Sequence, residues 1–556
     1  MVVDITNDGQ MSSTDPEMDL DPDTARVTGG AHFEASFGPG RYRAFTCVDF
    51  KGDGYELGAP TEFGAWLADF PVKQSVTVTQ LYTSFTDQIG ALFTFAPNGN
   101  GTTSILARVG VSFISSEQAC ANAEEEIPDF DFERVRSASR AQWNELLGRV
   151  QVDTSNVDPE IVDLFYSSFY RTHLSPADYT GENPLWNSTE PYYDSFYCNW
   201  DTYRTLYSFM ALHDPATFAR IVRGMINIQQ HEGWLPECRG ATAKHYIQGG
   251  SNGDPIVAEF FVKFHEHAKD LSVPADALYN ALLADAELQP PNWDLQGRQV
   301  NIWKTLGYIP SDVWERSGTN SKQVSRTLEY AFDDFSISQV AKILGKSADG
   351  KKYSQYAPHD TAKLIALQGG KEKFVSRLNF IFDQGYFDST DEPSQQIPFM
   401  YHYANRPGLS TQRSRQVIAE FYNTSINGLP GNDDSGAMGS YVAFYLAGLY
   451  PLPATRQFLL SSPYFREITF QNPVLKTTTT IRANGFRGNP KNGTGGHVFV
   501  QSVKINGKPW KSNCFIDWDA FTSGSLIELQ LTDNINVGCG AGADALPPSL
   551  STGGYD

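Results

Sequence analysis

The period of the hydrophobic pattern changes twice along this chain, and these changes limit the folds open to it. Over residues 1–125 short apolar runs alternate with Gly, Pro and Asp turns, a pattern typical of β-strands. Over residues 155–465 apolar residues recur at helical spacing, and a helical linker is expected over 126–154. Alternation returns over 466–537, and the Gly-, Pro- and Ser-rich tail 538–556 is expected to be disordered. The sequence therefore predicts a multidomain α+β protein.

The net charge of the chain argues against two classes of partner. The chain has 556 residues, too many for one ordinary core, and a formal net charge of -21 with no run rich in Lys or Arg. Such a charge repels nucleic acid and anionic membranes, and no apolar run is long enough to span a bilayer. Aromatic residues make up 13% of the chain, and surplus aromatic side chains in loops are typical of clefts that bind sugars. Neutral carbohydrates and calcium remain compatible partners.

The cysteines and glycosylation sequons bear on the cellular compartment. The cysteines show no CxxC spacing, so neither a zinc site nor a redox motif is supported and their pairing stays open: Cys47, Cys120, Cys198, Cys238, Cys514 and Cys539. Sequons that permit a secretory history occur at Asn100, Asn187, Asn423 and Asn492. The first residues lack the pattern of a signal peptide and read like the inside of a β-rich domain. We therefore expect the chain to begin part-way through a longer protein.

A turn that ends in two adjacent carboxylates precedes a strongly apolar stretch. The turn, GLPGNDDSG, covers residues 428–436, and the apolar stretch runs over 437–450. An acidic pair on a rigid loop can supply a general base or part of a metal shell. Alternatively, Asp434 or Ser435 caps the following helix, although capping leaves the second carboxylate unexplained.

Two further loops concentrate polar and aromatic residues. In NWDTYR, over residues 199–204, Trp200 and Asp201 could stack on a sugar and bind its hydroxyls. An Asp201–Arg204 pair that holds a helix start explains the pattern equally well. The turn GGSNGD, over residues 249–254, is more simply a loop and a helix cap.

A predicted helix over residues 325–335, SRTLEYAFDDF, carries the best candidate for a general acid. Glu329 and Asp333 share one helix face, and neighbouring aromatic side chains would border Glu329 with apolar surface. Apolar surroundings favour the protonated form of a carboxylic acid, although a solvated acidic face is a slightly simpler interpretation. A glycosidase needs two carboxyl groups across the sugar, and Glu329 with the Asp433/Asp434 pair would supply them. This pairing follows from the chemistry of the reaction and is not selected by spacing.

Several long motifs resemble the fungal branch of glycoside hydrolase family 92. The motifs occur in the order of that family: WDTYRT (200–205), SRTLEYAFDDF (325–335), EPSQQIPFMYHYANRP (392–407) and GLPGNDDSGAMGSYVAFYLAGLYP (428–451). Shorter similarities extend nearly to both ends of the chain: VDITND (3–8), RVGVSFIS (108–115) and SVKINGKPW (502–510). The resemblance implies a calcium-dependent exo-α-mannosidase that acts with inversion, often on α-1,2-linked mannose of N-glycans. It also implies a partial N-terminal β-sandwich, a central (α/α)6 barrel domain over 155–465 and a small C-terminal β segment.

The resemblance assigns roles to individual residues. Glu329 matches the general acid and Asp434 the general base, while Asn432 stands where many relatives have an assisting Asp. Trp200 and Asp201 match the mannose subsite. The full set of expected substrate contacts is Trp200, Asp201, Arg204, Asn252, His359 and Glu392.

Two departures from the family pattern leave alternatives open. The chain is shortened near residues 346–356, where relatives carry a motif that supplies calcium ligands, so Ca²⁺ is expected as cofactor with unknown ligands. The start of the sandwich domain is also missing ahead of Met1. The alternatives are an impaired glycan-binding relative, a truncated gene model, or an amidase that releases whole N-glycans. The resemblance implies secretion, whereas the missing signal peptide leaves the cytosol as the alternative.

Overall fold

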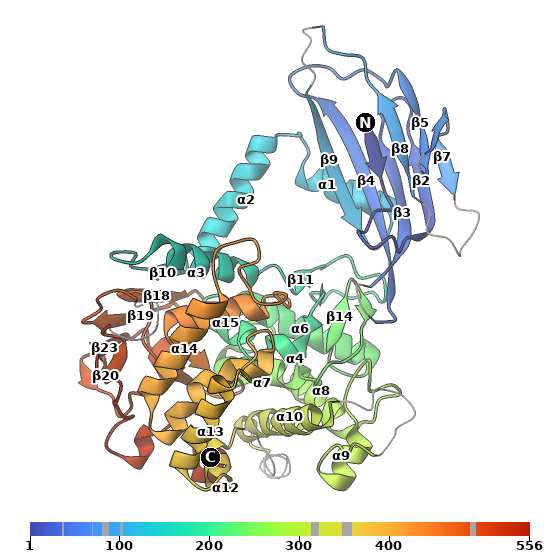
Figure 1. Cartoon of the computed structure of the whole chain (residues 1–556). Helices are drawn as coiled ribbons and strands as arrows, with labels where there is room; N and C mark the ends of the chain where they lie inside the picture. The colour runs from blue at the N-terminus through green and yellow to red at the C-terminus, as the bar shows by residue number, and fades with distance from the viewer. Residues whose placement is uncertain are drawn as a thin grey trace. The chain divides into compact units, whose positions relative to one another are not determined.

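The computed structural model describes residues 1–35, 38–68, 70–79, 88–99, 104–312, 322–346, 359–489 and 496–555. They form two compact units that interleave along the sequence (Figure 1). The first unit consists of Met1–Trp143, Asp178–Asp194 and Arg239–Tyr246, and the second of Asn144–Ala177, Ser195–Cys238 and Ile247–Asp556. The domain boundaries that we predicted from the sequence, at residues 125, 154, 465 and 537, remain predictions. Most of the predicted shortened segment, 346–356, and the sequons at Asn100 and Asn492 lie outside the described residues.

The first unit contains two antiparallel sheets. One has the order β7 (Thr77–Thr79), β2 (Thr14–Leu20), β3 (Val27–Glu34), β4 (Arg41–Gly52), β9 (Ile105–Ser112). The other has the order β1 (Val2–Asp4), β8 (Ile89–Thr94), β5 (Glu62–Leu67), β6 (Phe70–Lys73). Met18 and Val48 of the first sheet share one apolar core with Ile89 and Phe93 of the second. The alternating pattern therefore gives each sheet one buried face.

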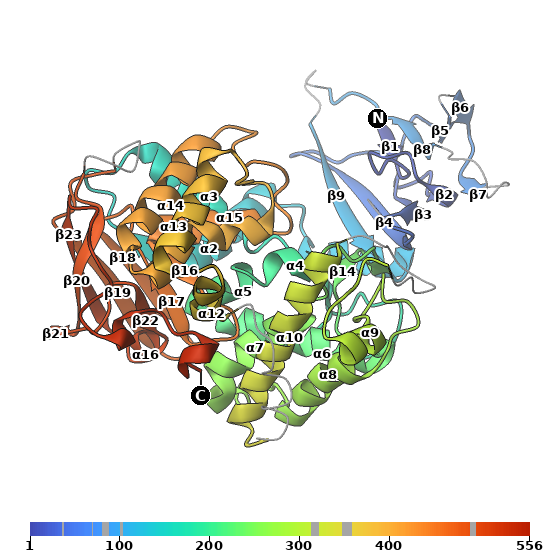
Figure 2. The ribbon, with the colours of Figure 1, turned by 60° about the horizontal axis from the view of Figure 1, so that its bottom comes forward.

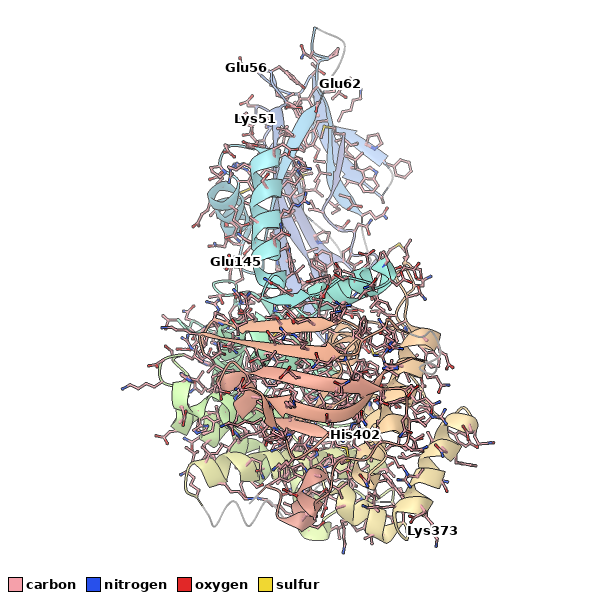
Figure 3. The ribbon with its side chains drawn as sticks, turned by 90° about the vertical axis from the view of Figure 1, so that its left-hand side faces the viewer. Lys51, Glu56, Glu62, Glu145, Lys373 and His402 are labelled. Atoms are coloured by element: carbon pink, nitrogen blue, oxygen red, sulfur yellow. A yellow bond between two sulfur atoms is a disulfide. The ribbon has the colours of Figure 1, made fainter. Side chains whose placement is uncertain are left out.

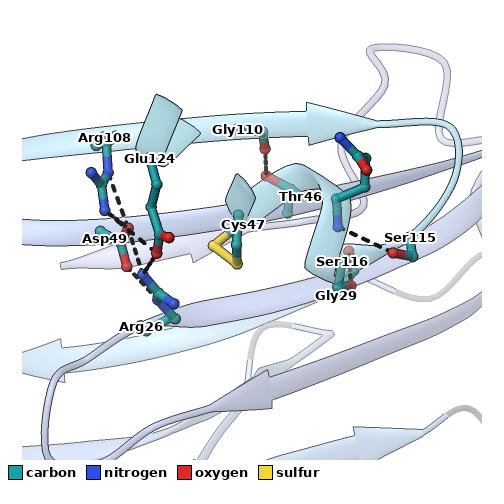
Figure 4. The surroundings of a disulfide bond; sticks show 12 residues. Arg26, Gly29, Thr46, Cys47, Asp49, Arg108, Gly110, Ser115, Ser116 and Glu124 are labelled. Carbon is teal, nitrogen blue, oxygen red and sulfur yellow. Dashed lines mark hydrogen bonds and ion pairs between the residues drawn. A yellow bond between two sulfur atoms is a disulfide. The ribbon is translucent and has the colours of Figure 1, made fainter. Parts of the chain in front are cut away.

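A helix that the sequence did not separate from the β region covers the five-stranded sheet. This helix, α1 (Ser116–Glu126), is joined to β4 by the Cys47–Cys120 disulfide (Figure 4). A Cβ atom at Gly110 would lie 1.9 Å from the Ala119 carbonyl oxygen, so this close approach requires glycine. The next helix, α2 (Phe132–Leu147), falls within the predicted linker.

Helices form most of the second unit (Figure 2). Its longer helices are α3 (Pro159–Arg171), α5 (Leu206–His213), α6 (Pro215–Glu232), α7 (Gly253–Phe264), α8 (Ala275–Glu287), α10 (Gln323–Ile343), α13 (Lys371–Asp383), α14 (Pro407–Phe421) and α15 (Ala437–Ala447). Shorter ones are α4 (Asn199–Thr202), α9 (Val300–Leu306), α12 (Thr361–Leu367) and the 3-10 segment η2 (Glu392–Ala404). Every residue of α7 and α15 is buried, so these two helices lie inside the unit. The (α/α)6 arrangement itself stays a prediction.

A six-stranded sheet completes the second unit (Figure 3). Its order is β10 (Val150–Val152), β18 (Glu467–Asn472), β19 (Thr477–Asn484), β23 (Leu526–Thr532), β20 (Phe499–Ile505), β21 (Lys508–Pro509). Strand β10 comes from the predicted linker and pairs antiparallel with β18. The C-terminal β region is therefore continuous with an earlier part of the chain, a long-range pairing that local periodicity cannot reveal.

The structure differs from the sequence prediction at the C-terminal tail, 538–556. Cys539 forms a disulfide with Cys514, and the 3-10 turns η3 (Ala543–Ala545) and η4 (Leu550–Thr552) follow. The Tyr555 ring packs against Phe335, and its carbonyl accepts a hydrogen bond from Lys342. These contacts order a segment whose composition alone suggests disorder. Among the described helices, none is long and apolar enough to cross a membrane.

Candidate active site

One short stretch of the second unit, residues 199–204, connects two groups of acidic side chains. Helix α4 places Asp201 beside Glu392 and Asp434, three residues that we call the carboxylate triad. The turn after α4 places Tyr203 and Arg204 against Glu329. We call Tyr203, Arg204 and Asn252, which all donate to Glu329, the donor group.

The donor group supplies hydrogen bonds to both oxygens of the buried Glu329 side chain. Arg204 Nη2 donates to Oε1 at 2.7 Å, and Tyr203 Oη donates to Oε2 at 2.7 Å. Asn252 Nδ2 donates to Oε2 at 3.2 Å and to Asp333 Oδ1 at 2.9 Å. Glu329 and Asp333 are buried, so the solvated acidic face that the sequence slightly favoured is wrong. Apolar surroundings do not describe the Glu329 carboxyl group either, because polar groups from two other segments reach it.

Two glycines allow the loop before α7 to approach the donor group. A Cβ atom at Gly249 would lie 2.6 Å from the Trp200 ring, and one at Gly250 would lie 2.7 Å from Glu329 Cβ. The segment thus has a role beyond the turn and helix cap predicted from the sequence. Gly249 and Gly250, which precede Ser251, let the backbone come this close, and the Asn252 side chain then donates to Glu329.

The carboxylate triad gathers three acidic side chains, and the nearby charge of Arg204 lowers the pKa of one of them, Asp201, without forming an ion pair with it. Their nearest oxygens lie within 4.8 Å of one another, and no Lys or Arg of the described residues forms an ion pair with them. Burial raises the pKa of Asp201 well above its usual range, and the Asp434 charge raises it further. Burial, followed by the charges of Asp201 and Asp434, raises the pKa of Glu392 to about 10. The triad is therefore short of positive charge.

The two aspartates of the DD turn have different tasks. The Asp433 carboxylate accepts hydrogen bonds from the N–H groups of Gly436 and Gly439 at 3.0 and 3.1 Å, and so caps α15. Asp434 and Ser435 have φ angles of 45° and 55°, and Asp434 contributes to the triad. The cap is therefore Asp433 and not Asp434 or Ser435, the two residues that the sequence suggested for it.

Most of the predicted site residues come together, and two do not. The residues that meet around the donor group and the triad are Trp200, Asp201, Arg204, Asn252, Glu329, Glu392 and Asp434. His359 instead packs its ring 4.0 Å from Phe332 and has Nε2 3.3 Å from the Pro453 carbonyl oxygen. Burial lowers the pKa of His359 to about 4, as expected for a neutral packed side chain. Asn432 is exposed.

Sequence reasoning did not single out three other residues of the site. Tyr203 lies in the WDTYRT motif, but only the structure shows that it donates to Glu329. Burial, followed by the charges of Asp434 and Asp201, raises the pKa of Tyr197 to about 12, which places it near the triad. Glu237 accepts a hydrogen bond from the Trp200 N–H at 2.7 Å. No local pattern marked Glu237, because its partners are distant in sequence.

The triad is chemically suited to a hard cation. Ca²⁺ prefers six to eight oxygen ligands, most often carboxylates, carbonyls and water. The three side chains supply carboxylate oxygens from separate segments of the chain. Glu392 Oε1 is buried without a hydrogen-bond partner, as expected for an atom that awaits a ligand. The oxygen ligands of the triad therefore fit calcium.

The chain matches known proteins over nearly its whole length. A family model described as the glycosyl hydrolase family 92 catalytic domain matches residues 118–357 and 349–533. A protein of Arthroderma benhamiae described as a secreted glycosidase is 33% identical over 629 residues, covering 100% of this chain and 76% of the relative. The relative must contain residues that this chain lacks, because the aligned length exceeds 556. The two family-model matches overlap at 349–357, and all but the last residue of this overlap falls in the segment that the sequence predicts to be shortened, 346–356.

Solved structures share the fold at lower identity. A family 92 inverting mannosidase from Bacteroides thetaiotaomicron has a TM-score of 0.81 at 21% identity, covering 99% of this chain and 80% of its own. A family 92 α-mannosidase from the same organism, in complex with mannoimidazole, has a TM-score of 0.80 at 19% identity, covering 97% and 76%.

Proposed function

Because the chain belongs to glycosyl hydrolase family 92, we propose that it is an exo-α-mannosidase that removes terminal mannose from glycoprotein N-glycans. The proposed bond is the α-1,2 linkage and the proposed stereochemistry is inversion. One observation carries the proposal: residues 199–204 join Glu329 to the carboxylate triad. A single short stretch of chain thus positions the two sets of carboxyl groups that glycoside hydrolysis requires.

In this proposal Glu329 is the general acid and Asp434 the general base. Asp434 is the partly exposed member of the triad, so a water molecule can reach its carboxylate. Asp434 takes a proton from this water as the water oxygen attacks the anomeric carbon. Glu329 gives a proton to the glycosidic oxygen as the carbon–oxygen bond breaks. The products are mannose of inverted configuration and a glycan with a free hydroxyl.

The hydrogen bonds of Glu329 must change before it can act as an acid. Both of its oxygens accept hydrogen bonds from the donor group, and Oε1 accepts from Arg204 alone. We assign Oε1 to the glycosidic oxygen, so a bound substrate displaces Arg204. Arg204 can then bind a sugar hydroxyl, the substrate contact expected from the sequence.

The first mannose subsite is proposed to lie at Trp200 and Asp201. Trp200 is half-buried, and its indole N–H has no partner among the described residues. The Arg204 guanidinium lies 5.4 Å from the centre of the Trp200 ring, which keeps the ring beside the donor group. An aromatic face next to charged hydrogen-bonding groups is typical of sugar subsites.

Calcium is the proposed cofactor, held by Asp201 and Glu392. Both residues are buried within the triad, which leaves the more accessible Asp434 free for its role as base. When bound there, Ca²⁺ would polarise and orient the 2- and 3-hydroxyls of mannose. The protein's own contribution is to hold the oxygen ligands in place before the sugar arrives.

A glycan-binding relative without turnover is the second candidate function. It is favoured by the division of the family match into two parts that overlap at 349–357, near the place where the resemblance implies that a segment with calcium ligands is missing from this chain. An N-glycan amidase with a cysteine nucleophile is not favoured, because all six cysteines form disulfides: Cys47–Cys120, Cys198–Cys238 and Cys514–Cys539.

Mannose release from α-1,2-linked mannobiose, with calcium and then with a chelator, tests the proposal. Calcium-dependent release that is lost in Glu329→Gln supports the mannosidase. Binding of the disaccharide without release supports the glycan-binding alternative. A folded protein that neither binds nor cleaves the disaccharide overturns both.

A further inference from the structure

Glu237 is a buried carboxyl group that the proposed reaction does not use. It lies just before strand β14 (Cys238–Gly240), with 1% of its surface exposed. Oε1 accepts a hydrogen bond from the Trp200 N–H at 2.7 Å, and Oε2 accepts one from the Asn252 N–H at 2.6 Å. Among the described residues, these two backbone groups are its side-chain hydrogen-bond partners.

The two N–H groups belong to separate segments that both reach Glu329: the Trp200 loop, residues 199–204 including the short helix α4, and the Asn252 loop, residues 249–252 before α7. The loop of Trp200 continues to Arg204, and Asn252 donates from its side chain, so each loop contributes part of the donor group. Glu237 is therefore the side chain whose two oxygens connect these loops directly.

The chain around Glu237 is itself fixed to the first loop. Cys198, one residue before Asn199, forms a disulfide with Cys238, one residue after Glu237. The Asn199 side chain donates to the Pro236 carbonyl at 2.7 Å, and the Asn199 N–H donates to the Glu237 carbonyl at 3.3 Å. The backbone at Glu237 is thus held against residues 198–199, and its carboxyl group extends from there to the Asn252 loop.

The chemistry at this position requires two acceptors. A glutamine of the same shape has one acceptor and one donor, so it would face one of the two N–H groups with its own N–H. Burial of a carboxyl group without a cationic partner is unfavourable. Burial accordingly raises the pKa of Glu237 well above its usual range. The hydrogen bonds from the Asn252 and Trp200 N–H groups lower the pKa and so offset part of this cost.

We propose that Glu237 is a positioning residue that fixes the Trp200 loop and the Asn252 loop relative to each other and so aligns the donor group on Glu329. The catalytic consequence rests on the proposed function. The loop connection does not, so the two can be tested separately.

Glu237→Gln is the test variant, and Glu259→Gln is its matched control. Glu259 is also fully buried and accepts a backbone hydrogen bond, from Ala454 N–H at 2.8 Å, but its other partners are Ser208 and Lys263. Hydrogen–deuterium exchange on the full chain should show faster exchange at residues 199–204 and 249–252 in Glu237→Gln only. On α-1,2-linked mannobiose, Glu237→Gln should lower kcat by about 10- to 100-fold with a smaller change in KM. Glu237→Asp, which keeps both acceptors, should recover part of this loss.

Each outcome separates the inference from the proposed function. Unchanged exchange in both loops of Glu237→Gln overturns the inference, as does a loss of kcat no larger than that of Glu259→Gln at equal melting temperature. A wild-type protein that does not cleave mannobiose removes the catalytic consequence and contradicts the mannosidase. In that case the exchange measurement, made without sugar, still decides whether Glu237 connects the two loops.

Discussion

The same six residues, 199–204, contact Glu329 and supply Asp201 to the carboxylate triad, yet the electrostatic surroundings of the two groups differ. Glu329 is a single carboxyl group that accepts hydrogen bonds from three donors, one of them a guanidinium. The triad consists of three carboxyl groups without an ion pair to any Lys or Arg of the described chain. An ion pair balances the charge at Glu329. At the triad the Arg204 charge lowers the pKa of Asp201 without forming an ion pair, so most of the balance is left to protons, a cation or substrate hydroxyls.

This difference separates the part of the site that is complete before ligands bind from the part that is not. A preorganised group acts by keeping its geometry, so mutations there should affect the rate. An incomplete group acts by taking up a ligand, so mutations there should affect the response to that ligand. The following experiments test this division.

The largest expected effect is the loss of the proton donor. Glu329→Gln keeps the shape and one acceptor for the donor group but cannot donate a proton as an acid, so kcat should fall by about 10²- to 10⁴-fold. The variant also loses the buried ion pair with Arg204, so its melting temperature should fall as well. Mannose release and thermal unfolding measure the two quantities. Glu372→Gln, on the exposed side of α13, is the control and should behave as wild type. A Glu329→Gln protein with more than a tenth of wild-type kcat would contradict the assignment.

Calcium should stabilise the triad and leave the Glu329 region unaffected. At a concentration of 100 times Kd, the ion should raise the free energy of unfolding by about 2.7 kcal/mol, visible as a higher melting temperature than in chelator. Asp201→Asn and Glu392→Gln should each lose most of this shift, because each removes a ligand charge from the site. Glu329→Gln should keep it. Equal melting temperatures of the wild type in calcium and in chelator would show that the triad is balanced by protons.

The local sequence pattern predicted the helix and the turn that carry the site residues better than it predicted which of these residues contact one another. The helical period over 325–335 predicted a helix that carries Glu329 and Asp333 on one face, and in α10 both residues contact Asn252. The turn residues at 428–436 predicted a rigid acidic loop, in which Asp433 caps α15 and Asp434 lies in the triad. Both predictions depend on residues within about one turn of each other, where periodicity and turn chemistry operate.

The sequence could not show which distant residues meet. It suggested that Asp201 pairs with Arg204, but Arg204 forms its ion pair with Glu329, and Asp201 joins Glu392 and Asp434. The two oxygens of Glu237 connect loops that are about 50 residues apart, and no local signal marks such a connection. Charge balance is a property of three-dimensional neighbours, so the contrast between Glu329 and the triad appears only in the structure.

The two groups must be compared at a pH that preserves the fold, and His402 (Figure 3) contributes to that limit. Burial lowers the pKa of His402 from 6.5 to about 4, so the unfolded chain binds a proton there more readily than the folded one. The contribution to stability is complete above about pH 6.5 and decreases as the pH falls toward 4. Between pH 7 and pH 5 the free energy of unfolding should fall by about 2 kcal/mol through this residue.

Urea unfolding of wild type and His402→Gln at both pH values measures this contribution. The variant should be less stable at pH 7, because it loses the hydrogen bond between Nε2 and the Leu460 carbonyl, but less sensitive to pH. His359, whose pKa is also lowered to about 4, should retain its own share of the pH dependence in the variant. An unchanged pH dependence in His402→Gln would contradict the assignment. The calcium and kcat comparisons should therefore be made near pH 7.

The smallest expected effect on stability comes from one methyl group on the Glu329 side of the site. In Gly250→Ala the new Cβ would lie 2.5 Å from Asn252 Oδ1 and 2.7 Å from Glu329 Cβ, so the Asn252 amide must turn away and the loop must shift. The destabilisation should be about 1 kcal/mol, the lower end of the range for overpacking, because one of the two atoms ends a flexible side chain. Gly58→Ala, where a Cβ meets no atom within 4 Å, is the control.

Because the methyl group of Gly250→Ala disturbs the Asn252 hydrogen bond to Glu329 but not the triad, kcat should fall while the calcium-induced rise in melting temperature persists. If Gly250→Ala removes the calcium response together with the activity, the two groups act as one unit and the division between them is wrong.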